Sequence, residues 1–199
     1  AVFNELKRLG EWNLPNPLDG VRTFREDEKE MSWLTLRQIT ELLDGCERYG
    51  KPDLTMICKV CLATGARWTE AETLTRSQLS PNKLSFFKTK GGKNRTVPIP
   101  QWLYDELKER QGRMFKPCYQ DFKKMLATTT IQLIEGQKTH VLRHTFASHF
   151  MMNGGNILVL QRILGHANIR ETMKYAHFAP DHLEEAAALN PLASLVSTN

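Results

Sequence analysis

The chain has 199 residues, of which 41% are hydrophobic and 25% are charged, a balance typical of a soluble globular domain and not of a disordered chain. No run approaches the roughly 18 apolar residues of a membrane helix, and the first residues lack a signal-peptide pattern, so we expect a cytoplasmic protein without membrane contact. The formal net charge of +5 permits a polyanionic partner but does not establish one.

Residues 1–31 differ in pattern from the rest of the chain. Apolar residues recur at helical spacing over residues 1–11, and Pro15, Pro17 and Gly20 then prevent the helix from continuing. We expect residues 1–31 to be the end of a preceding domain with its linker, and residues 32–199 to be the main domain. Because the chain opens in what reads as the last part of a helix, we also expect an N-terminal part of the protein to be missing.

The main domain begins with two helices whose ends carry clear signals. Thr35 is placed to cap the first helix, with Gln38 reaching back to the cap. Asp53 is expected to cap the second, an apolar helix that Gly65 closes. The second helix is therefore predicted to lie in the core.

Arg67 follows the end of this second helix directly, at the junction with another helix. Taken alone, an arginine here would pair with Glu70 or Glu72 and have a structural role only. A functional role for Arg67 therefore depends on what other basic residues accompany it.

The four cysteines raise the question of a metal or redox site. Only Cys58 and Cys61 have ligand-like spacing, and no second ligand pair lies near them in the sequence. The two residues are also three apart on an apolar helix, which favours small core residues with reduced thiols. We therefore expect the cysteines to be structural, and we expect no metal or cofactor site. The cysteines are Cys46, Cys58, Cys61 and Cys118.

A β-hairpin is predicted from two short apolar runs, residues 83–90 and 95–100, separated by a segment with two glycines. Its lysines, Lys88, Lys90 and Lys93, are compatible with a solvated turn and also with a basic tip that enters a DNA groove. Two amphipathic helices, 102–111 and 119–128, follow it. These elements predict an α+β domain that is mainly α-helical with a small antiparallel sheet.

The segment from residue 139 to 175 concentrates side chains that bind or attack phosphate. His140 and Arg143 are three apart on a predicted helix, which places both on one face. Residues 153–155 end this helix, and Asn156 caps the next. Taken singly, each polar residue has a structural reading, such as a hydrogen-bonded core histidine or a solvated arginine.

The second of these helices ends at Gly165, which leaves His166 in the turn, and Tyr175 follows nine residues later. A last helix is predicted from Asp181 to Leu189, with residues 181–199 forming a C-terminal tail.

The series His140-x-x-Arg143, Leu164-Gly165-His166 and Tyr175 resembles the C-terminal half of tyrosine recombinases. The sequence around these motifs is similar to that of temperate-phage integrases. The resemblance matches two further residues. Arg67 stands at the position of the family's first arginine, and Lys90 at that of its hairpin lysine, with Lys88 as the alternative. The six matches occur in family order over about 110 residues, which is far more specific than one short motif.

The resemblance implies the catalytic domain of a phage integrase, a site-specific recombinase that acts without a metal on duplex DNA at attachment sites. Tyr175 would form a 3′-phosphotyrosine intermediate, and the arginines with His166 would bind the phosphate. His140 would be the base and Lys90 the acid that protonates the leaving oxygen. The expected partners are DNA, other copies of the chain and DNA-bending accessory proteins, and the missing N-terminal part would clamp DNA.

Elementary chemistry agrees with these roles. A phosphodiester gains negative charge as it is displaced, so cations must be in place beforehand, and two arginines can supply them. A phenol with a pKa of about 10 needs a base or nearby cations before it attacks at neutral pH. Two alternatives stay open: a type IB-like topoisomerase with the same chemistry, and a DNA-binding module in which Tyr175 and the histidines are core residues.

Overall fold

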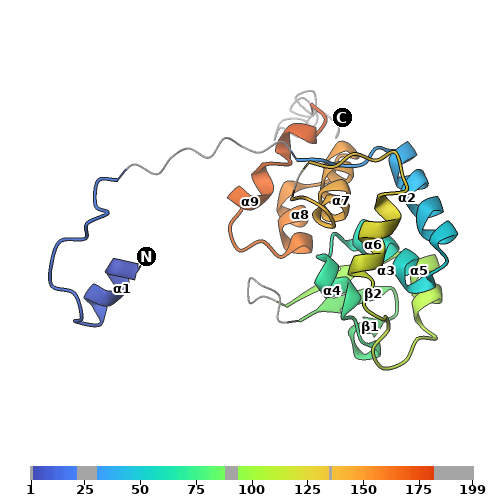
Figure 1. Cartoon of the computed structure of the whole chain (residues 1–199), viewed down its shortest axis with the longest axis horizontal. Helices are drawn as coiled ribbons and strands as arrows, with labels where there is room; N and C mark the ends of the chain where they lie inside the picture. The colour runs from blue at the N-terminus through green and yellow to red at the C-terminus, as the bar shows by residue number, and fades with distance from the viewer. Residues whose placement is uncertain (1, 22–30, 88–93, 135, 182–199) are drawn as a thin grey trace, which may run out of the picture. The chain divides into compact units, whose positions relative to one another are not determined.

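The computed structural model describes residues 2–21, 31–87, 94–134 and 136–181. The chain divides into two compact units, Ala1–Glu30 and Met31–Asn199. The first unit contains helix α1, Val2–Arg8, which ends before the two prolines, and none of its described residues is buried. The other described helices and strands belong to the second unit (Figure 1).

The second unit confirms the predicted α+β class, because its described residues form mainly helices and a small antiparallel sheet of three strands. Its elements in chain order are α2 Leu36–Tyr49, α3 Pro52–Thr64, α4 Trp68–Glu72, the 3₁₀ turn η1 Arg76–Gln78, β1 Leu79–Ser80, β2 Lys83–Phe86, β3 Arg95–Pro98, α5 Gln101–Leu107, α6 Tyr119–Leu126, α7 His140–Met152, α8 Ile157–Leu164, α9 Arg170–Met173 and the 3₁₀ turn η2 Ala176–Phe178. Within the described ranges, no helix is both long and apolar enough to cross a membrane.

The start of α2 follows the sequence signals, whereas the start of α3 departs from them. Thr35 caps α2, and the Gln38 carboxamide oxygen accepts a hydrogen bond of 2.9 Å from the Thr35 backbone N–H, as predicted. The prediction that Asp53 caps α3 is wrong. Lys51 occupies the cap position, because Pro52 takes the first helical position that suits its fixed φ. The Asp53 carboxylate instead accepts a hydrogen bond of 2.6 Å from Arg110.

Helix α3 lies in the core, as its apolar sequence predicted. It packs against α2, α4 and α7 (Figure 1), and Leu54, Ile57 and Val60 are fully buried. Burying one such aliphatic side chain contributes about 1.5–3 kcal/mol. The four cysteines are also buried and free, which confirms that they are core residues.

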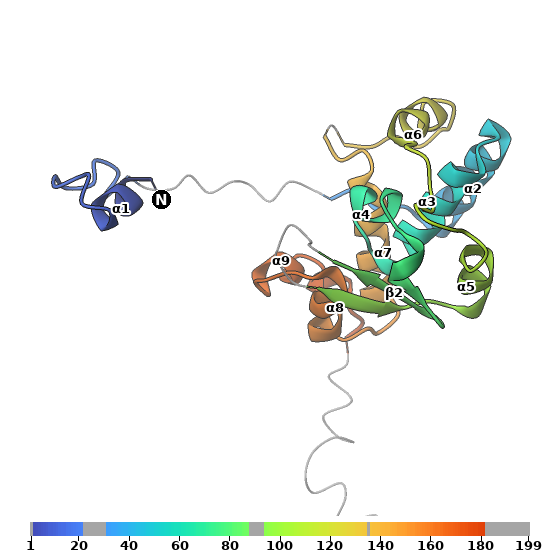
Figure 2. The ribbon, with the colours of Figure 1, turned by 90° about the horizontal axis from the view of Figure 1, so that it is seen from below.

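The hairpin has the predicted antiparallel pairing, with Leu84 of β2 opposite Val97 of β3. The strand β1, only two residues long, adds a third strand through the pair Leu79 and Leu84. Helix α8 packs against β3, and Figure 2 shows it beside the sheet. The hairpin tip, with Lys88, Lys90 and Lys93, lies outside the described residues, as do residues 182–199 with the predicted Asp181–Leu189 helix.

Candidate active site

Arg67 is positioned by the sharp turn between α3 and α4. Gly65 ends α3 with a φ of +64°, and a Cβ atom on it would lie 2.6 Å from the Phe146 ring and 2.7 Å from Leu164. Glycine is therefore required there both for its conformation and for the close packing of α3 on α7 and α8. Arg67 follows as the residue that caps α4.

Glu70 holds Arg67 in place, as the sequence suggested. Its carboxylate accepts one hydrogen bond from the Arg67 backbone N–H, at 2.9 Å, and another from the Arg67 guanidinium, at 3.1 Å. The same carboxylate accepts hydrogen bonds of 2.6 and 3.2 Å from Arg95 of β3. Arg95 is buried and stacks on the Phe86 ring at 4.5 Å. One carboxylate thus fixes the first arginine to the base of the hairpin.

Glu70 also gives the fold an acid-sensitive element. Burial opposes its ionisation, but Arg95 and Arg67 outweigh burial and hold the pKa of Glu70 below its ordinary range. A carboxyl group with a lowered folded-state pKa stabilises the fold above its unfolded-state pKa and loses this contribution as the pH falls through the folded-state value. We expect the free energy of unfolding to fall less for Glu70→Gln than for the unmodified protein between pH 5 and pH 3, because the amide has no proton to gain in this range.

Chemical denaturation at the two pH values measures this difference. Glu47→Gln, at an exposed position of α2, is the matched control and should leave the pH dependence unchanged. An identical acid dependence for Glu70→Gln and the unmodified protein would contradict the role of the shared carboxylate.

Arg143 is buried on α7, 5% exposed, and ties together the ends of two helices. Its guanidinium donates to the carbonyl of Gly65, at 2.8 Å, and to that of Leu164, at 2.7 Å. These carbonyls lie at helix C-termini, where unpaired acceptors and the helix dipole favour a cation. Burial, followed by the charges of Arg67 and Arg95, lowers the pKa of Arg143 to about 10, so it stays protonated at neutral pH.

His166 lies in the turn after Gly165, as predicted, and contacts the same guanidinium. Its Nε2 is 3.0 Å from Arg143 Nη2, and its Nδ1 is 2.8 Å from the Thr172 hydroxyl. A guanidinium only donates, so Nε2 accepts and Nδ1–H donates to Thr172. Burial and then Arg143 lower the pKa of His166 to about 3, so the ring is neutral. His166 can therefore donate a hydrogen bond to a phosphate only after it gives up its hydrogen bond to Thr172 or to Arg143.

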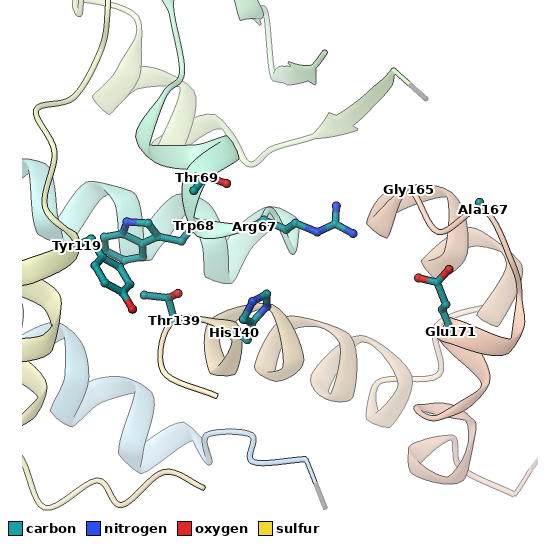
Figure 3. Close-up of a pocket in the computed structure, with 9 residues that line it drawn as sticks. All are labelled: Arg67, Trp68, Thr69, Tyr119, Thr139, His140, Gly165, Ala167 and Glu171. Carbon is teal, nitrogen blue, oxygen red and sulfur yellow. The ribbon is translucent and has the colours of Figure 1, made fainter. Parts of the chain in front are cut away.

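His140 and Arg67 face a common pocket of about 530 Å³ between α4, the start of α7 and the turn after α8 (Figure 3). Figure 3 shows Arg67 pointing across this pocket toward Gly165 and Glu171, with His140 below it. His140 is exposed, whereas Arg143 on the same helix is buried. The predicted helix that carries both residues is confirmed. Their side chains lie in different environments: His140 faces the pocket, and Arg143 is buried.

Tyr175 follows α9 and precedes η2, so it lies in a turn between two short helical segments. It is 1% exposed and packs in a small cluster with Ala147, Met151 and other apolar residues of α7 and α8. It is not among the residues that line the pocket of Arg67 and His140, whereas Tyr119 is. Burial, partly offset by Arg143, raises the pKa of Tyr175 to about 12.

His144 is the residue that sequence reasoning missed. Its Nδ1 lies 2.7 Å from the Tyr175 hydroxyl. Burial and then the charge of Lys174 lower the pKa of His144 to about 4, so it is neutral. A signal was present, because His144 lies four residues after His140 and so on the same side of the helix. Their ring centroids are 6.4 Å apart.

The structure thus brings five of the six predicted site residues into one region. Arg143 contacts His166, and Arg67 and His140 line one pocket. Tyr175 joins them through His144, which lies one turn after His140 on α7. The sixth, Lys90, lies outside the described residues, as does the alternative Lys88. Among the described residues, no cluster of three or more His, Cys, Asp or Glu side chains has the geometry of a metal site.

Comparison with known proteins gives a consistent result. The model of the phage integrase family matches residues 32–182. The integrase of Escherichia phage 186 is 59% identical over the whole chain, and the chain covers 59% of that protein's length. The chain therefore spans somewhat more than half of this curated relative.

Solved structures are similar too. The catalytic domain of bacteriophage HP1 integrase aligns with a TM-score of 0.79 and 57% identity, over 82% of this chain and 98% of that one. XerH site-specific recombinase bound to palindromic difH substrate, in a post-cleavage complex, aligns with a TM-score of 0.63 and 21% identity, over 84% of this chain and 55% of that one, which shows a shared fold. The chain belongs to the phage integrase family of tyrosine recombinases.

Proposed function

We propose that this chain is the catalytic domain of a site-specific recombinase that cuts and rejoins duplex DNA at phage and host attachment sites. The observation that carries the proposal is the convergence of Arg67, His140, Arg143, His166 and Tyr175, from four parts of the chain, on one region that holds an open pocket. Integration and excision of phage DNA, in the cytoplasm of a bacterial host, is the biological reaction that we infer.

Two arginines supply the charge that the reaction needs. Arg67 and Arg143 hold the non-bridging oxygens of the scissile phosphate, whose negative charge grows in the transition state. Arg143 already donates to two backbone carbonyls and to His166 Nε2, so its remaining N–H groups are the ones available to a phosphate. The cation is preorganised, because the protein holds it before DNA arrives.

The chemical step exchanges one phosphate ester for another. His140, which is exposed in the pocket, is the base that we propose for the proton of Tyr175, and the phenolate oxygen bonds to phosphorus. In the structure the hydroxyl is bonded to His144, so the proton reaches His140 only after this hydrogen bond is exchanged. The bond from phosphorus to the 5′ oxygen breaks, and Lys90 protonates this oxygen, a role that rests on the family resemblance. The 3′-phosphotyrosine keeps the ester energy, and attack by a 5′ hydroxyl of another strand reverses the step without ATP.

The partners that we infer are attachment-site DNA, further copies of the chain that form a dimer or tetramer on DNA, and DNA-bending accessory proteins. XerH in complex with its difH substrate supports the DNA partner. In this proposal, residues 1–31 are the end of a DNA-binding domain with its linker, and residues 32–199 are the catalytic domain.

A duplex nicked just downstream of the scissile phosphate tests the function. The short piece released by cleavage diffuses away, so religation fails and a covalent complex accumulates. The assay needs low salt, since a domain with few phosphate contacts binds DNA weakly and loses affinity steeply as salt rises. We expect a band that survives denaturation when attachment-site DNA is supplied. Its absence, with DNA binding intact, would contradict the proposal.

Chelation gives a separate prediction. Because two guanidinium groups supply positive charge to the phosphate, we expect EDTA to leave the rate of covalent complex formation unchanged. The rate on the nicked duplex with and without EDTA, with magnesium added back as the control, measures this. Loss of the complex in EDTA and its recovery with magnesium would show that a divalent ion takes part.

A further inference from the structure

The hydroxyl of the proposed nucleophile has a defined hydrogen-bond partner. Among the described residues, His144 Nδ1 is the one hydrogen-bond partner of the Tyr175 hydroxyl, at 2.7 Å. The phenol is protonated at neutral pH and the imidazole is neutral. The buried O–H must donate to an acceptor, so Nδ1 accepts this hydrogen bond and Nε2 carries the ring proton.

His144 and Tyr175 belong to elements of different length. His144 is on the second turn of α7, a helix of 13 residues that packs on α3 in the main core. Tyr175 is in a turn between two helical segments of four and three residues. The apolar cluster around the Tyr175 ring restrains the ring but has no directional contact with its oxygen. The hydrogen bond to the rigid helix is therefore what fixes the position of the oxygen.

We propose that His144 is a positioning residue of the nucleophile: it holds the Tyr175 hydroxyl, through Nδ1, against α7, the helix that also carries His140 and Arg143. The inference rests on the proposed function, in which Tyr175 is the attacking group. His144 acts through Tyr175 and is distinct from His140, which faces the pocket one helical turn earlier. The effect is on alignment, and misplacement of a reacting atom by about 1 Å costs on the order of 10²-fold in rate.

Two substitutions at this position separate alignment from bulk packing. His144→Asn places an amide oxygen where Nδ1 lies, so an acceptor remains, and the amide does not act as a base. His144→Leu has a similar volume and no acceptor. We expect His144→Asn to form the covalent complex on the nicked duplex within about 3-fold of the unmodified rate, and His144→Leu to be slower by on the order of 10²-fold with unchanged DNA affinity.

Controls make the result specific. His177→Leu changes an exposed histidine on η2 in the same way and should leave the rate unchanged. Thermal unfolding of each variant shows whether it folds. If His144→Leu does not fold, His144→Gln replaces it, since its amide oxygen lies one bond farther out and should not restore the rate.

The outcomes are distinguishable from failure of the proposed function. If the unmodified protein forms no covalent complex, the proposed function fails. If the unmodified protein reacts and a folded His144→Leu or His144→Gln reacts at the same rate or faster, the positioning role is wrong. A His144→Asn variant as slow as His144→Leu would also overturn it, because an acceptor at the Nδ1 position would then be insufficient.

Discussion

Tyr175→Phe is expected to bind attachment-site DNA with nearly unchanged affinity and to form no covalent complex. The substitution removes the attacking oxygen and keeps the ring that packs with Ala147 and Met151. It also leaves His144 Nδ1 without its hydrogen-bond partner, for which we expect a stability loss of about 1–3 kcal/mol. Covalent complex formation on the nicked duplex and DNA binding by gel shift measure the two properties separately.

The matched control for this prediction is Tyr119→Phe. Tyr119 lines the pocket that contains Arg67 and His140, so pocket geometry alone would select it as the nucleophile. Its ring packs edge-on against Trp68 at 6.4 Å, and its position in the chain has no counterpart in the family motif. We expect Tyr119→Phe to keep covalent complex formation. The opposite pattern, with Tyr119→Phe inactive and Tyr175→Phe active, would reassign the nucleophile.

Arg143→Ala is expected to lower the rate of covalent complex formation by about 10²–10³-fold, the usual cost of removing one preorganised donor at a charged transition state. It should also destabilise the domain. The carbonyls of Gly65 and Leu164 lose their charged donor, and an unpaired buried polar group costs about 1–3 kcal/mol. Rate measurement and chemical denaturation on the same preparation report both effects.

Arg143→Lys tests which property of the arginine matters. A lysine keeps the charge but not the planar fork that reaches both carbonyls and His166. We expect Arg143→Lys to recover part of the stability and little of the rate. Arg37→Ala, on the exposed surface of α2, is the control for loss of a positive charge and should change neither. A rate for Arg143→Ala close to that of the unmodified protein would show that the buried guanidinium does not serve the phosphate.

The predictable part of the fold is the part encoded in short segments. The capping box of Thr35 and Gln38 and the left-handed glycines Gly65 and Gly165 depend on residues within one or two turns, so the sequence shows them directly. Asp53 shows the limit of such signals. Its carboxylate could cap a helix or form an ion pair, and the pairing partner, Arg110, lies 57 residues away.

The candidate site divides in the same way. The positions of Arg67, His140 and His166 at helix junctions follow from local signals. The family motif then predicts that the three residues belong to one site. The burial of Tyr175 and its bond to His144 arise only when the segment after α9 packs on α7 and α8, which no local pattern specifies. Arg95 is an intermediate case, because it shares the alternation of Val97 and Ile99 and so belongs to the inward face of its strand.

The identity and polarity of the covalent link test the central claim most directly. The complex trapped on the nicked duplex is digested with protease and nuclease, and mass spectrometry locates the modified peptide. We expect a nucleotide attached through its 3′ phosphate to Tyr175, and a released DNA piece whose free 5′ hydroxyl accepts phosphate from a polynucleotide kinase. Attachment to Tyr119, Tyr104 or Tyr49, or a 5′-phosphotyrosyl link, would contradict this mechanism even if the DNA were cut.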